Sequence, residues 1–75
     1  MSIRYERETA IFARNLRRIM REKNVTQTWL AAETGMTKSA VCCWCGAKRE
    51  PTAIALKRIS VALGVTTDDL LEGVK

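Results

Sequence analysis

Apolar residues recur over one early segment of the chain with the spacing of an amphipathic α-helix, and no stretch alternates as a half-buried strand would. One side of this segment collects Ile11, Phe12, Leu16, Ile19 and Met20, and the opposite side collects Arg14, Arg17, Arg18 and Arg21. A first helix is therefore predicted over residues 9–23, with its apolar side on a core and its basic side in solvent. Residues 1–8 precede this pattern and are expected either to extend the helix or to form an N-terminal arm.

Threonine and glycine residues divide the remaining sequence into short helices. Hydroxyls at Thr26, Thr37 and Thr66 stand where they can accept hydrogen bonds from the exposed N–H groups of a following turn. Gly35 and Gly64 can adopt the left-handed backbone that ends a helix. We expect helices over about 27–34, 38–45 and 52–63, and a short one through residue 71. The stripe predicted to be buried on the 52–63 helix is Ala53, Leu56, Ile59 and Leu63. The fold class is thus all-α, one compact five-helix domain over residues 9–75.

Residues 27–46 have the order of a helix-turn-helix, in which two short helices are joined by a turn that contains glycine. Ala31 is small enough for a close helix crossing, and Gly35 stands at the turn. On the second helix Val41 and Trp44 are predicted to face inward. The outward side is predicted to carry Ser39, Cys42 and Cys43, with Lys38 at its flank. A helix of this kind fits a DNA major groove, which is about 12 Å wide.

Composition and charge narrow the class of protein. The chain has 75 residues, and 13 Lys and Arg against 8 Asp and Glu give a formal net charge of +5. That balance suits a nucleic acid or another acidic partner. No apolar run approaches the roughly 18 residues of a membrane span, and no signal peptide is visible, so we expect a cytoplasmic, nucleoid-associated protein without a membrane partner. With no His, no acid–base pair and no phosphate loop, we expect neither an enzyme nor a cofactor.

The helix-turn-helix segment and its flanks together resemble a known family. The matching residues are Thr26, Gln27, Leu30, Ala31, Gly35, Met36, Val41, Trp44, Lys48 to Pro51, Ala62 to Val65, and Asp69 to Leu71. Over about residues 10–71 the chain resembles the lambda-type phage repressors and Cro proteins of the wider Xre-like helix-turn-helix family. The resemblance implies a domain that binds double-stranded operator DNA as a two-fold homodimer and regulates transcription, as a Cro-like protein or a repressor headpiece.

The same resemblance implies roles for individual residues. Base readout falls to Lys38, Ser39, Cys42 and Cys43, and phosphate contacts fall to Thr26, Gln27, Thr37, Lys48 and Arg49. Several alternatives stay open. Gln27 can simply begin its helix, Lys38 can contact a phosphate, and Lys48 with Arg49 can be a solvated pair. Cys43 has a short side chain that forms only weak hydrogen bonds, so it is expected to touch a thymine methyl group if it reads a base.

Where many relatives carry an Arg and a Glu that form a partly buried ion pair, this sequence has Met20 and Cys45. Because both charged partners are replaced, neither leaves an unpaired buried charge, and these two side chains are expected to pack together. The three cysteines lack a fourth ligand, which argues against a metal site. Oxidation of Cys42 or Cys43 could block DNA docking, but three reduced thiols are the simpler expectation.

Late apolar residues suggest where a second copy would bind. Leu70, Leu71 and Val74 have little chain left to cover them, so they are the predicted dimer interface. Trp29 is expected in the core, with a dimer contact as the alternative. The competing function is a protein-interaction module, such as an antitoxin or adaptor with the same fold. An exposed apolar patch outside the recognition helix would favour it.

Overall fold

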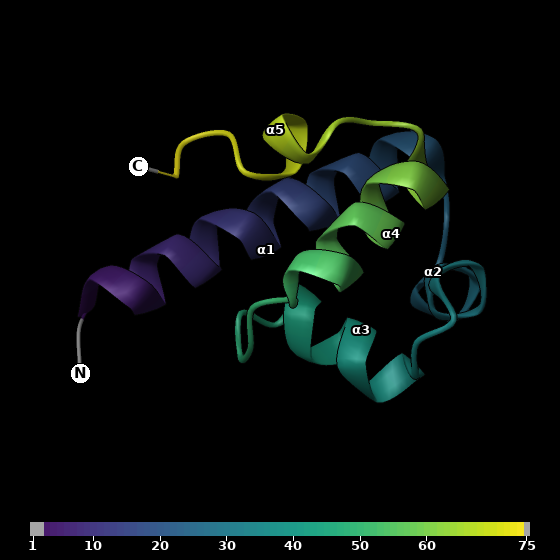
Figure 1. The fold of residues 1–75 in the computed structure, drawn as a ribbon, viewed down its shortest axis with the longest axis horizontal. Helices are drawn as coiled ribbons and strands as arrows, with labels where there is room; N and C mark the ends of the chain where they lie inside the picture. The colour runs from purple at the N-terminus through teal and green to yellow at the C-terminus, as the bar shows by residue number, and fades with distance from the viewer. Residues whose placement is uncertain (1–2, 75) are drawn as a thin grey trace.

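Five α-helices joined by short turns form the fold in the computed structural model, which describes residues 3–74 and the side chains of residues 8–74. The helices are α1 (Ile3–Lys23), α2 (Gln27–Thr34), α3 (Lys38–Cys45), α4 (Ala53–Leu63) and α5 (Thr67–Leu70). No strand occurs within residues 3–74, which confirms the all-α prediction. The long α1 runs diagonally, with the α5 tail on one side of it and α2, α3 and α4 on the other (Figure 1).

The helix boundaries follow local capping chemistry. The hydroxyls of Thr26, Thr37 and Thr66 each accept a hydrogen bond from the backbone N–H three residues later, at 3.0–3.1 Å. Gly35 and Gly64 take the left-handed backbone, with φ of 73° and 70°. These caps confirm the predicted boundaries of α2 and α3.

The first helix begins earlier than the predicted Thr9. It starts at Ile3, so residues 3–8 extend α1 rather than forming an arm. Met1 and Ser2, which belonged to the same prediction, lie outside the described residues.

The core lies where all five helices meet. Its buried members are Phe12, Leu16, Ile19, Met20, Leu30, Ala31, Val41, Trp44, Cys45, Ala55, Ile59, Leu63 and Leu70. On α4 the predicted stripe is rotated: Ala53 is exposed and Leu56 is only half-buried, while Ala55 takes a core position. The row Ala55, Ile59 and Leu63 repeats every four residues and is the row that meets the rest of the core.

Trp29 is not a core residue, which corrects the expectation drawn from its size. Its side chain is 37% exposed. The inward positions of α2 are Leu30, Ala31 and Thr34, so position 29 lies on a different side of this short helix. A helix of eight residues has room for only one buried stripe, and smaller side chains occupy it.

The C-terminal tail, which consists of α5 and residues 71–74, is held onto α1 by a buried amide. Asn15 Nδ2 donates to the carbonyl oxygens of Leu70 and Glu72, both at 2.9 Å. The Leu70 side chain is completely buried, so the expectation that its own chain leaves it uncovered is wrong. Leu71 and Val74 are half-buried and remain partly accessible.

We expect Asn15→Ala to destabilise the fold by about 1–3 kcal/mol, because two carbonyl groups next to the core lose their donor. Urea denaturation measures this loss, and hydrogen exchange should show faster opening of residues 70–74. Arg14→Ala, at the exposed neighbouring position, is the matched control and should change stability by less than about 0.5 kcal/mol. Equal effects of the two substitutions would contradict the role of the amide.

Candidate nucleic-acid interface

The two helices of the predicted helix-turn-helix are anchored on the core from one side only. Ala31 is 7% exposed at the contact between α2 and α3, and the N–H of Met36 donates to the Ala31 carbonyl at 3.0 Å. On α3 the inward residues Val41 and Trp44 are 0% and 2% exposed. This confirms the predicted inward face and leaves the opposite side of α3 free of intramolecular contacts that would bury it.

The outward side of α3 carries most of the residues that the sequence selected for base reading. Lys38, Ser39 and Cys42 are exposed together on it. Cys43 is half-buried and lies at the edge of this surface rather than on it. The exposed set joins one cation, one hydroxyl and one thiol, which are groups that can donate to acceptors on base edges.

Residues selected as phosphate contacts divide into two groups. Lys48 and Arg49 are exposed in the loop after α3, and neither pairs with a carboxylate among the side chains of residues 8–74. The hydroxyls of Thr26 and Thr37 already accept cap hydrogen bonds, but each retains its own proton to donate. Gln27 is half-buried, and its side chain forms a hydrogen bond with the Cys45 thiol. One polar group of Gln27 is therefore already engaged within the protein.

Two arginines hold the carboxyl ends of the helix-turn-helix, a role that the sequence pattern did not indicate. Arg17 of α1 donates a guanidinium N–H to the carbonyl of Cys45, the last residue of α3. Arg58 of α4 donates to the carbonyl of Thr34, the last residue of α2, at 3.4 Å. Cations at these ends also suit the negative pole of each helix. Arg17 is therefore not simply a solvated residue on the basic side of α1. Its contact with the end of α3 exists only because α1 crosses α3 in the folded chain.

The sulfur-containing side chains behave as the sequence predicted for positions 20 and 45. Cys45 Sγ donates to Met20 Sδ at 3.8 Å, and both residues are buried. Burial raises the pKa of the Cys45 thiol, against the opposing influence of the Arg17 charge and the Gln27 hydrogen bond. Within residues 3–74, no group of three potential metal ligands converges.

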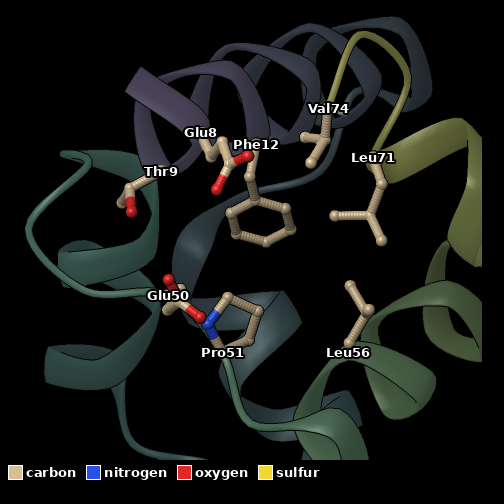
Figure 2. A pocket seen from close by; sticks show the side chains of 8 residues that line it. All are labelled: Glu8, Thr9, Phe12, Glu50, Pro51, Leu56, Leu71 and Val74. Carbon is tan, nitrogen blue, oxygen red and sulfur yellow. The ribbon is translucent and has the colours of Figure 1, made fainter. Parts of the chain in front are cut away.

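A pocket of about 200 Å³ lies between α1, the loop before α4, α4 itself and the tail. Its lining is Glu8, Thr9, Phe12, Glu50, Pro51, Leu56, Leu71 and Val74. Figure 2 shows Leu71 and Val74 on the tail facing the Phe12 ring and Leu56. Two of the predicted dimer residues thus border a hollow that is mainly apolar but also carries the Glu8 and Glu50 side chains, whereas Leu70 is buried in the core. No helix in residues 3–74 is long and apolar enough to cross a membrane.

Comparison with known proteins agrees with this geometry. A family model described as the Cro/C1-type HTH DNA-binding domain matches residues 15–75. The fold is similar to the crystal structure of the restriction-modification controller protein C.AhdI from Aeromonas hydrophila, with a TM-score of 0.79 and 22% sequence identity. That match covers 83% of this chain and 94% of the other. No curated protein sequence matches the chain.

The three thiols should differ in reactivity. Cys42 is exposed, whereas Cys45 is buried with a raised pKa and so holds little reactive thiolate. We expect a water-soluble disulfide reagent to modify Cys42 fast and Cys45 slowly in the folded protein. Variants that keep a single cysteine, with Ser at the other two positions, allow each rate to be followed by absorbance. Addition of urea should make the rates converge, and equal fast rates in the native protein would show that Cys45 is not buried.

Proposed function

Because the chain belongs to the Cro/C1-type HTH DNA-binding family, we propose that it is a transcriptional regulator that binds double-stranded operator DNA as a homodimer in the cytoplasm. The observation that carries this proposal is the exposed side of α3. Lys38, Ser39 and Cys42 stand on a helix whose opposite side is fixed by Val41 and Trp44. Such a helix can enter a major groove without any rearrangement of the core.

Contacts in the proposed complex divide between bases and phosphates. The Lys38 ammonium can donate to guanine O6 and N7, and the Ser39 hydroxyl can bond several base edges. Lys48 and Arg49 follow α3 in an exposed loop, where the chain leaves the groove and passes the sugar-phosphate backbone. The Thr26 and Thr37 protons and the free part of Gln27 supply further phosphate donors at the N-termini of α2 and α3, where the helix dipoles favour an anion.

The proposed dimer uses the partly accessible apolar residues of the tail. Leu71 and Val74 border the pocket beside Phe12 and Leu56, and a second copy that covered them would bury this apolar part of the pocket. Leu70 is not part of the proposed interface, since it is buried within its own chain. Two recognition helices related by a two-fold axis would then meet successive major grooves, about 34 Å apart.

Selection of bound sequences from a random DNA pool tests the proposal directly. We expect a two-fold symmetric motif with half-sites about one duplex turn apart, and sedimentation of the saturated complex should give two chains per site. Leu71→Asp should lower the proportion of two-chain complexes, because it replaces an apolar residue of the proposed interface by a charged one. A single chain per site at saturation would exclude the dimer, and recovery of unrelated sequences would exclude specific DNA binding.

Base reading and phosphate binding should separate on mutation. Lys38→Ala is expected to relax the preference at one position of each half-site, with a cost of about 1–3 kcal/mol against the preferred base. Lys48→Ala or Arg49→Ala should weaken all sequences almost equally, because phosphates carry no sequence information. Removing one cation from a phosphate should also lower the slope of log affinity against log salt by about one unit, or by about two if both subunits of the dimer are affected.

Binding to a panel of single-base operator variants at several salt concentrations makes this distinction. The matched control is Lys23→Ala, an exposed lysine at the end of α1, which should leave both preference and salt slope nearly unchanged. If Lys38→Ala changes only the salt slope, Lys38 contacts a phosphate, and base readout passes to Ser39, Cys42 and Cys43 or to DNA shape.

A protein-interaction role for the same fold is the second candidate function. The exposed Ile54 and Val61 on α4 favour it, because they lie outside the recognition helix. The two roles are compatible, since α4 and α3 are different surfaces. If the folded chain shows no salt-dependent retention on DNA, protein interaction is the candidate function that remains.

A further inference from the structure

One side of α4 carries large apolar residues that the fold does not bury. Ile54 is 66% exposed and Val61 is 68% exposed. They are seven residues apart, about two helical turns, and therefore lie on the same side with Lys57 between them. We call Ile54, Lys57 and Val61 the α4 stripe. The core row of the same helix is a different set, Ala55, Ile59 and Leu63, so the stripe is not needed to hold the monomer together.

A groove runs beside the stripe, between α4 and the last turn of α2. It is lined by Ala32, Glu33, Thr34, Gly35, Lys57, Arg58, Val61 and Ala62. Three of the four residues on the α2 wall are small, Glu33 being the exception, and the α4 wall places Val61 and Ala62 beside two cations. Exposed apolar residues beside a groove with polar edges are a common feature of protein-binding surfaces.

The charges along the groove decide which occupant fits. Two cations, Lys57 and Arg58, face one carboxylate, Glu33, and neither forms an ion pair with a described side chain. Arg58 is partly engaged with the Thr34 carbonyl, which leaves the Lys57 ammonium free in the middle of the stripe. An anionic group placed opposite Lys57 is therefore favourable, and a cationic one is not.

A second copy of this chain is the less favourable occupant. If two α4 helices paired antiparallel about a two-fold axis, Ile54 of one copy would meet Val61 of the other. The two Lys57 side chains would then lie near the axis, opposite each other. Like charges placed across an interface in this way cost binding energy. The stripe is also separate from Leu71 and Val74 of the tail, which border the pocket on the other side of α4.

We propose that the α4 stripe docks an amphipathic helix of a different, acidic protein. The docked helix would present two apolar side chains about two turns apart, one toward Ile54 and one toward Val61. A Glu or Asp between them would pair with Lys57. The stripe contains no residue of α2 or α3, so the exposed side of α3 stays free for the proposed DNA binding, although the last turn of α2 walls the groove beside the stripe.

Selection from a displayed library of randomised helical peptides tests the proposal without DNA. The bait is the folded full chain, and binders that also retain the Ile54→Asp variant are discarded. We expect the recovered helices to share apolar residues two turns apart with a carboxylate between them. Recovery of cationic helices, or of none, would overturn the proposal.

Variants then localise the binding of the recovered peptides. Val61→Asp and Lys57→Glu should each weaken it by at least about tenfold, and exchanging the peptide carboxylate for Lys should restore binding to Lys57→Glu. Lys48→Glu is the matched control, an exposed lysine outside α4, and should leave the affinity unchanged. All these positions are exposed, and circular dichroism checks that each variant folds. An equal loss with Lys48→Glu would show attraction by net charge alone and would overturn the proposal.

Sedimentation of the chain without DNA or peptide tests whether a second copy of the chain, rather than an acidic partner, covers the stripe. We expect Val61→Asp to leave the mass distribution of the free chain unchanged. A shift from a larger species to the monomer on this substitution would show that a second copy covers the stripe, and would overturn the proposal of an acidic partner. Failure of the chain to select any DNA sequence from a random pool would leave these results unaffected.

Discussion

The rotation of α3 about its own axis is the constraint on which the candidate interface depends. Val41 and Trp44 lie three residues apart, so a single orientation buries both. Each large apolar side chain contributes about 1.5–3 kcal/mol when it is buried rather than exposed. Turning α3 over would lose this burial and force Lys38 toward the core without a partner. The outward position of Lys38, Ser39 and Cys42 therefore follows from what the opposite side buries.

Neighbouring helices fix the remaining freedom of the helix-turn-helix at its ends. The last carbonyl groups of a helix have no partner within it, and here a guanidinium from outside supplies one for each helix. Arg17 serves α3 and Arg58 serves α2, so α1 and α4 hold the pair from two directions. Arg58 also lines the groove beside the α4 stripe. The groove and the helix-turn-helix consequently share Arg58 as well as the last turn of α2.

Cys45 has two polar groups near the core, its thiol and its backbone carbonyl, and each has a partner. Its side chain is a thiol that packs on the Met20 thioether, which avoids burying a charge. Its carbonyl accepts from Arg17, whose cation stays at the protein surface. The Arg17 cation thus lies at the C-terminus of α3, while the core beside it contains only the uncharged sulfur side chains of Met20 and Cys45.

Local signals in the sequence were sufficient to predict the helices and the inward side of α3. Threonine caps, left-handed glycines and periodic apolar residues each act within one or two turns of chain. The contact of Met20 with Cys45 spans a longer distance and was predictable only through the family pattern. Local patterns could not place Leu70, Trp29 or Ala53, because their burial depends on how far each helix rotates against its neighbours.

Contacts between distant parts of the chain became visible only in the folded molecule. The Asn15 amide meets the tail 55 and 57 residues later, and Arg17 reaches a carbonyl 28 residues away. No spacing rule connects such positions, since the contact exists only after the helices have crossed. Ile54 and Val61 were not part of the stripe predicted to be buried on the 52–63 helix, but their exposure became visible only in the folded molecule. Ala55, Ile59 and Leu63 fill the core positions of α4, which leaves Ile54 and Val61 on the surface.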